Sequence, residues 1–205
     1  MSEPRSVRHP SEERTLDASV RMPREEQVAT SVSMVIGELV GNFEEFLQNE
    51  EQIRASYPWA TRFVLGYPLP KWQRPLVWSP EQKIRFITSI WCGIDIGSYL
   101  LNDCAEVIEE QPARGIVIFR EFSNVLLDGQ QRMSSIEEYL LGAFAVMDTQ
   151  GTPRLWSELP RIERRRFEST HFSRCTVKSW NEGQLRKIYN LRAFGGTAHR
   201  ESERA

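Results

Sequence analysis

Four prolines between residues 57 and 78 constrain the fold more than any other feature of this sequence. Pro58, Pro68, Pro70 and Pro75 all fall within YPWATRFVLGYPLPKWQRPLVW. Proline has no backbone N–H and disfavours helical geometry in the residue before it, so no long helix crosses this segment. We therefore expect extended chain here.

Helical patterns stand on both sides of the proline-rich segment. Apolar residues recur at helical spacing from Ser31 and predict a helix to about Glu51, continuing weakly toward Ala55. Ser79-Pro80-Glu81-Gln82 is a typical helix start, and Gly93 is a typical helix end. Further helices are predicted from the DGQQR sequence through about Met147, and over about 157–168 and 182–193.

Short apolar runs predict strands that do not alternate regularly with the helices. They are 97–103, 115–119, 124–127 and about 171–177, and we expect 115–119 and 124–127 to be joined by a tight turn through Arg120 and Glu121. This irregular order favours an α+β domain with a small mixed sheet flanked by helices over a doubly wound parallel sheet. We expect residues 1–28 to form a flexible polar arm and 29–205 to form a single domain.

Composition excludes several classes of protein. The 205 residues carry 26 Lys and Arg against 28 Asp and Glu, a net charge of -2, so a generally basic DNA-coating surface is excluded but a local basic site is not. No apolar run is long enough to span a membrane and no secretory signal is present, so we expect a cytoplasmic protein. The three scattered cysteines argue against disulfides and a zinc site, and a P-loop sequence is absent.

The strongest local signal is the sequence NVLLDGQQRMSS. An apolar strand leads directly into Asp128-Gly129-Gln130-Gln131-Arg132 and then into a helix. Gly129 permits a sharp turn, the helix N-terminus offers unpaired N–H groups to an anion, and Arg132 is able to grip a phosphate. Asp128 could bind a metal ion or orient a water. The alternative is purely structural: Asp128 caps the helix and Arg132 pairs with a surface carboxylate.

Two further clusters have a functional and a structural interpretation each. Gln73 and Arg74 lie between two tryptophans, which suits a nucleotide, although core tryptophans with an outward-pointing arginine explain the pattern equally well. In YNLRAFGGTAH, two glycines after a helix are usually a C-cap, but with Asn190 and His199 they could also cradle a ligand. The RIERRR run at 161–166 is best explained as a solvated helix face.

The order LPKWQRPLVWSPEQ, GIDIGSYLLN, LLDGQQRMSSIEEYL, YNLRAFGGTAHR resembles the N-terminal domain family of GmrSD-type modification-dependent restriction enzymes over about residues 60–200. This resemblance implies a ParB/sulfiredoxin-like fold that binds and hydrolyses a nucleoside triphosphate (NTP), with Mg²⁺ as cofactor, in phage or restriction-defence biology. It implies catalytic roles for Asp128, Gln131 and Arg132, a metal-binding role for Asp128, and nucleotide binding by Gln73, Arg74, Gly129, Gln130, Asn190, Gly195, Gly196 and His199.

Two departures from the family pattern leave other functions open. Ala193 stands where relatives often have Asn, and the chain has no nuclease domain of the HNH type, so we expect a stand-alone form that works with DNA or with a separate nuclease or defence protein. One alternative is a non-catalytic DNA-binding or regulatory sensor. A weaker one is a metal-dependent nuclease in which Glu137 and Glu138 assist Asp128, although Glu138 is expected to face solvent.

Overall fold

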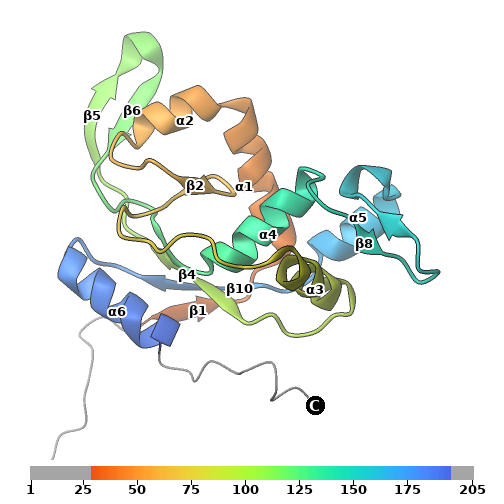
Figure 1. The fold of residues 1–205 in the computed structure, drawn as a ribbon. Helices are drawn as coiled ribbons and strands as arrows, with labels where there is room; N and C mark the ends of the chain where they lie inside the picture. Colours follow the sequence, from red (N-terminus) through yellow and green to blue (C-terminus); the bar gives the residue numbers. More distant parts are fainter. Residues whose placement is uncertain (1–28, 195–205) are drawn as a thin grey trace, which may run out of the picture.

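The computed structural model describes residues 29–194 and places a mixed four-stranded sheet at the centre of the fold (Figure 1). The strand order is β1 (Thr30–Val32), β10 (Ser173–Val177), β4 (Ser98–Asn102), β7 (Leu126–Asp128). β10 and β4 run parallel, while the two outer pairs are antiparallel. The predicted α+β class with a small mixed sheet is confirmed.

Alternating side chains of the sheet enter two separate cores. Tyr99, Leu101 and Leu126 belong to the larger core, whereas Leu100 and Leu127 belong to the smaller one. This alternation is the two-residue period of a strand that is covered on both faces. In Figure 1 the helix α6 (Glu182–Phe194) lies on one side of the sheet, and α4 (Gln130–Leu140) lies on the other.

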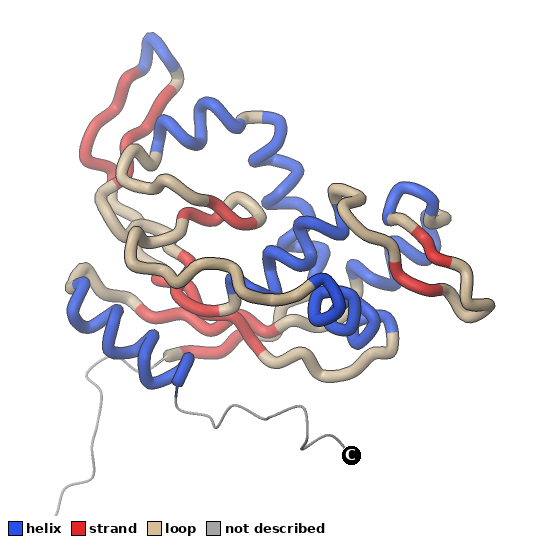
Figure 2. Tube along the Cα trace, viewed as in Figure 1, coloured by secondary structure: helices blue, strands red, loops and turns tan. Residues whose placement is uncertain are grey.

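Four other helices and three hairpins complete the described part. The helices are α1 (Ile36–Gln48), α2 (Glu50–Ser56), α3 (Pro80–Trp91) and α5 (Arg161–Glu168). The hairpins pair β2 (Phe63–Val64) with β3 (Tyr67–Pro68), β5 (Val107–Gln111) with β6 (Ile116–Phe119), and β8 (Val146–Met147) with β9 (Pro153–Arg154) (Figure 2). There are also two short 3₁₀ turns. η1 (Pro112–Arg114) connects β5 to β6, and η2 (Trp156–Glu158) lies between β9 and α5.

The predicted start and end of α3 are confirmed in detail. The Ser79 hydroxyl accepts the Gln82 N–H and the Gln82 side chain accepts the Ser79 N–H, which is a complete capping box. Gly93 follows the helix with a φ of 69°, and its N–H donates to the Ile90 carbonyl. The proline-rich segment between α2 and α3 contains no helix, as predicted; it forms the β2–β3 hairpin and has further turns at 58–59 and 71–72.

The predicted tight turn through Arg120 and Glu121 is present, since the Ser123 N–H donates to the Arg120 carbonyl at 3.1 Å, but the two strands that it joins do not pair with each other. β6 pairs with β5, a strand that the sequence did not indicate, and β7 joins the central sheet instead. The chain turns between them through Phe122 and Asn124, whose φ angles are 71° and 52°, and the Asn124 N–H bonds to the Cys104 carbonyl. This turn directs β7 away from β6.

Three predicted helices have different bounds. The first begins at Ile36, because residues 30–32 pair with β10, and it breaks at Asn49. The helix after DGQQR ends at Leu140 and not at Met147, because Gly142 takes a φ of 76°. The charged helix begins at Arg161 after Pro160, with η2 before it. The predicted arm, residues 1–28, lies outside the described residues.

Candidate functional site

The strand-to-helix turn at Asp128–Gly129 forms as predicted. Asp128 ends β7 and Gly129 is the N-cap of α4, with a φ of 103°. A Cβ on Gly129 would lie 2.8 Å from the Cβ of Tyr99, so this position needs glycine for both its conformation and its space. Gly129 has no side chain that could accept a hydrogen bond, so no side chain of the N-cap residue satisfies the first N–H groups of α4.

The Asp128 carboxylate lies between two arginines. Its Oδ2 is 2.7 Å from Nε of Arg192 and 3.3 Å from a terminal nitrogen of Arg132. The Asp128 side chain is 17 % exposed, so these ion pairs are only partly screened by solvent. One negative and two positive groups give the cluster a net charge of +1. The local field therefore favours an anion, although the chain as a whole is slightly acidic.

Arg132 is held in place by its surroundings. One terminal nitrogen donates to the Ile96 carbonyl at 2.9 Å, and the guanidinium lies 5.5 Å from the centre of the Phe172 ring. Burial lowers the pKa of Arg132, and the charge of Asp128 opposes that effect. Arg132 is therefore better placed to position Asp128 than to leave it for a ligand.

Arg192 of α6 contacts the same carboxylate. It was not among the residues selected from the sequence. It also donates to the backbone carbonyl and the hydroxyl of Ser98, each at 2.7 Å. Burial opposes its charge, but the hydrogen bond and charge of Asp128 leave the pKa of Arg192 raised. A signal was present: Leu185, Tyr189 and Arg192 are spaced by four and three residues and share the inward face of α6.

The two glutamines of the motif bind the backbone of the proline-rich segment. Gln131 accepts the N–H groups of Val77 and Trp78 at 3.0 and 3.2 Å and donates to the Pro75 carbonyl at 3.0 Å. Gln130 donates to the Arg74 carbonyl. These contacts join the DGQQR turn to the segment that contains Gln73 and Arg74. They also give Gln131 a structural role beside its predicted catalytic one.

Two buried amide oxygens at this junction lack a donor. Gln73 is 5 % exposed and Gln130 is 3 % exposed. The nitrogen of Gln73 donates to the Leu127 carbonyl at 3.2 Å, but within residues 29–194 the Oε1 atoms of both glutamines lack a hydrogen-bond partner. An unsatisfied buried acceptor costs about 1–3 kcal/mol, so a donor from water or a ligand would stabilise this arrangement.

The remaining sequence-selected residues are less well placed. Arg74 and Asn190 are exposed, so Arg74 is free to reach a ligand only from the solvent side. Trp72, beside Gln73, packs on Tyr189 of α6 with ring centres 5.3 Å apart, and Arg186 lies over it at 5.3 Å. Gly195, Gly196 and His199 lie outside the described residues.

The acidic residues farther along α4 do not turn toward Asp128. Glu137 is half-buried and accepts the Leu65 N–H. Glu138 does not simply face solvent but binds Lys83 at 2.6 and 2.7 Å. Among residues 29–194, no group of three or more His, Cys, Asp or Glu side chains is arranged to hold a metal ion. This arrangement gives the metal-nuclease alternative no help from Glu137 or Glu138.

The arginine-rich run on α5 is largely exposed, as predicted, and two of its arginines also bind backbone carbonyls. Arg164 donates to the carbonyls of Ser157 and Leu159, and Arg166 bonds weakly to the Trp91 carbonyl.

Among the described residues, no helix is long and apolar enough to cross a membrane.

Comparison with known proteins gives one match. The model of the family described as "GmrSD restriction endonuclease, N-terminal domain" matches residues 43–197, which is most of the chain and includes Gln73, Arg74 and the DGQQR sequence but ends before His199. No curated protein and no solved structure matches the chain.

Proposed function

Because the chain belongs to the GmrSD restriction endonuclease N-terminal domain family, a family associated with restriction systems, we propose that it binds a nucleoside triphosphate at Asp128 and hydrolyses it. The observation that carries this proposal is the cluster of one carboxylate and two guanidinium groups, with its net charge of +1, beside the start of α4. A triphosphate is the kind of polyanion that such a cluster attracts.

In this proposal Arg192 is the main phosphate ligand. Its side chain is 29 % exposed, against 22 % for Arg132, and its bonds to Ser98 hold the guanidinium beside Asp128. The first N–H groups of α4 add hydrogen bonds to the phosphate oxygens. The free oxygens of Gln73 and Gln130 accept N–H or O–H donors of the nucleotide or of an ordered water.

Asp128 is the residue proposed to act on the attacking water. Both arginines contact its Oδ2, and a phosphate that draws Arg192 away leaves the carboxylate free to accept a proton from water. The single carboxylate fits a Mg²⁺ ion that arrives with its nucleotide, since Mg²⁺ uses one or two carboxylates together with substrate phosphates. Asp128 would hold that ion, which would neutralise phosphate charge.

The test is nucleotide binding and turnover by the purified protein with Mg²⁺ and each of the four NTPs. We expect Asp128→Asn to abolish turnover while nucleotide still binds, because the cluster then becomes more positive. We expect Arg192→Gln to weaken binding about tenfold or more, since a charge-assisted hydrogen bond contributes about 1.5–3 kcal/mol. Arg54→Gln, which removes an exposed arginine of α2 from its pair with Glu50, is the matched control and should change neither.

A regulatory sensor that binds nucleotide without turnover is the second candidate. Gln131 is fully used in holding the 75–78 segment, and Asp128 is already neutralised by its arginines, which leaves few groups for catalysis. Binding that depends on Arg192 without measurable turnover would establish this function. Absence of binding to all four NTPs would refute both, and salt-dependent binding of DNA would then be the assay for the remaining alternative.

A further inference from the structure

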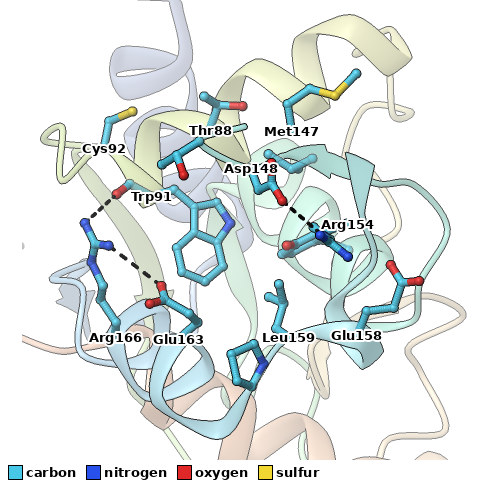
Figure 3. Close-up of a pocket in the computed structure, with 14 residues that line it drawn as sticks. Thr88, Trp91, Cys92, Met147, Asp148, Arg154, Glu158, Leu159, Glu163 and Arg166 are labelled. Carbon is cyan, nitrogen blue, oxygen red and sulfur yellow. Dashed lines mark hydrogen bonds and ion pairs between the residues drawn. The ribbon is translucent and has the colours of Figure 1, made fainter. Parts of the chain in front are cut away.

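A cavity of about 780 Å³ lies between α3, the β8–β9 hairpin and α5 (Figure 3). None of the residues that line it belongs to the candidate site at Asp128. Tyr139 borders the cavity near the end of α4, nine residues after Gln130. At 1.5 Å per residue this separates the two places by about 14 Å along the helix, so the cavity is a distinct site.

The inner surface of the cavity is mainly apolar and contains an accessible aromatic ring. Figure 3 shows the Trp91 indole in the middle of the ring of lining side chains, with Leu159 beside it and Met147 at the upper edge. Trp91 packs on Phe167 with ring centres 5.0 Å apart, which fixes the orientation of the indole. A fixed, partly exposed indole offers a flat surface for stacking.

On each of two opposite walls of the cavity, an acidic side chain lies beside an arginine. Asp148 is 2.9 Å from Arg154 and also accepts the backbone N–H groups of Gln150 and Thr152, so its carboxylate is fully used. On the other wall Glu163 is 3.7 Å from Arg166.

Glu158 adds a fifth charge, which leaves three acidic side chains against two arginines and a net charge of -1. One of its oxygens accepts the Leu155 N–H at 2.7 Å. A phosphate or other polyanion would be repelled by this negative charge. A cation would lose its hydration in a mainly apolar cavity whose three carboxylates already bind Arg154, Arg166 or the Leu155 N–H. The lining therefore favours a molecule without net charge.

We propose that this cavity binds a neutral, flat aromatic molecule of two or three rings, stacked on Trp91. The volume lies within the range of about 300–1,000 Å³ that is usual for small-molecule sites, and an apolar interior with few polar groups is typical of them. Polar edges of the ligand would face the hydroxyls of Thr88 and Thr149 and the second oxygen of Glu158. This proposal does not depend on nucleotide binding at Asp128.

The experiment uses three naphthalene probes that share a ring but differ in charge. 2-Naphthol, naphthalene-2-sulfonate and 2-naphthylmethylammonium are titrated separately into the ¹⁵N-labelled full chain and followed by amide and indole NMR signals. We expect 2-naphthol to bind with the Trp91 indole signal among those that shift, and both charged probes to bind at least about tenfold more weakly. Failure of 2-naphthol to bind, or equal binding of a charged probe, would overturn the proposal.

Variants that narrow the cavity locate the binding. Thr88 is exposed on α3 and lines the cavity close to Trp91, so Thr88→Trp should occupy the space beside the indole without disturbing the core. Ile162→Trp is the matched control, since Ile162 is 69 % exposed and does not line the cavity. We expect Thr88→Trp to weaken 2-naphthol binding at least about tenfold and Ile162→Trp to leave it unchanged. If Thr88→Trp fails to fold, Met147→Trp narrows the cavity from its edge; unchanged binding in the narrowed protein would refute the proposal.

Discussion

The two glycines at the ends of α4 allow the close packing at the DGQQR turn to be measured. Gly129 and Gly142 both have positive φ angles, of 103° and 76°. An added Cβ at Gly129 would lie 2.8 Å from the Tyr99 Cβ and 3.3 Å from its Cα, whereas nothing lies within 4 Å of one at Gly142. Substitution by alanine therefore imposes backbone strain at both positions, but steric overlap only at Gly129.

The expected magnitudes follow from these two contributions. A left-handed conformation costs an alanine about 1–2 kcal/mol, which is the whole expected effect of Gly142→Ala. Overpacking adds about 1–3 kcal/mol at Gly129, because Tyr99 is 1 % exposed and its backbone belongs to the central sheet. We therefore expect Gly129→Ala to lower the free energy of unfolding by about 2–5 kcal/mol.

Urea unfolding followed by circular dichroism measures both variants on the same scale. For a domain of this size each 1 kcal/mol corresponds to a shift of about 2–4 °C in Tm, so thermal unfolding provides an independent check. The denaturant slope should stay unchanged in both variants, since neither alters the surface exposed on unfolding. If Gly129→Ala is no more destabilising than Gly142→Ala, the close approach of Gly129 to Tyr99 is not a real constraint.

Three further predictions concern the contacts of α4. Gln131→Ala should destabilise the protein by about 2–4 kcal/mol and speed hydrogen exchange of the two backbone amides that Gln131 accepts. Lys83 and Glu138, only 18 % and 28 % exposed, should show a coupling of about 1 kcal/mol or more in a double-mutant cycle. Burial raises the pKa of Glu137, so the folded state binds more protons than the unfolded state between the usual Glu value of about 4.3 and the raised one. The free energy of unfolding should therefore fall as pH rises through that window, and Glu137→Gln should remove this dependence.

Each of these predictions has a control within the chain. The pair of Arg54 and Glu50 is 45 % and 48 % exposed and should show a coupling below about 0.5 kcal/mol; equal coupling in both pairs would contradict the role given to burial. For Gln131→Ala, uniform acceleration of hydrogen exchange across α4 and the 75–78 segment would indicate global unfolding and not the loss of the local hydrogen bonds of Gln131. A pH dependence of urea unfolding that is identical in wild type and Glu137→Gln would show that Glu137 is not the group responsible.

Local patterns were predictable wherever a short stretch of sequence determines the geometry. Ser79, Pro80 and Gln82 define the start of α3 by themselves, and an apolar run marks β4. The pairing of β7 was not predictable from adjacency, since it depends on positive φ angles at Phe122 and Asn124, residues that carry no strong signal for them. β5 was missed because most of its residues are exposed and the sequence VIEEQ lacks an alternating apolar face.

The candidate site, too, was predictable from the sequence only in part. The turn at Asp128 and Gly129 follows from residues that are adjacent in the chain, so it could be predicted. The ion pair of Asp128 with Arg192 joins residues 64 positions apart and could be anticipated only by asking which side of α6 faces inward. Asn190 was selected from the YNLRAFGGTAH pattern and from the resemblance, but it is exposed, whereas Tyr189 and Arg192 lie on the inward face of α6.

The position of β10 in the sheet has a consequence for biosynthesis. β10 lies between β1 and β4, and Thr30 pairs with Thr176, 146 residues later in the chain. A nascent chain that has not yet released residue 177 from the ribosome cannot form either of these pairings. The order of translation therefore delays closure of the sheet until most of the chain is made, and such long-range pairing is expected to make folding slow. Until then the edge of β4 that pairs with β10 remains unpaired, and an unpaired strand edge makes a partly folded chain prone to aggregation.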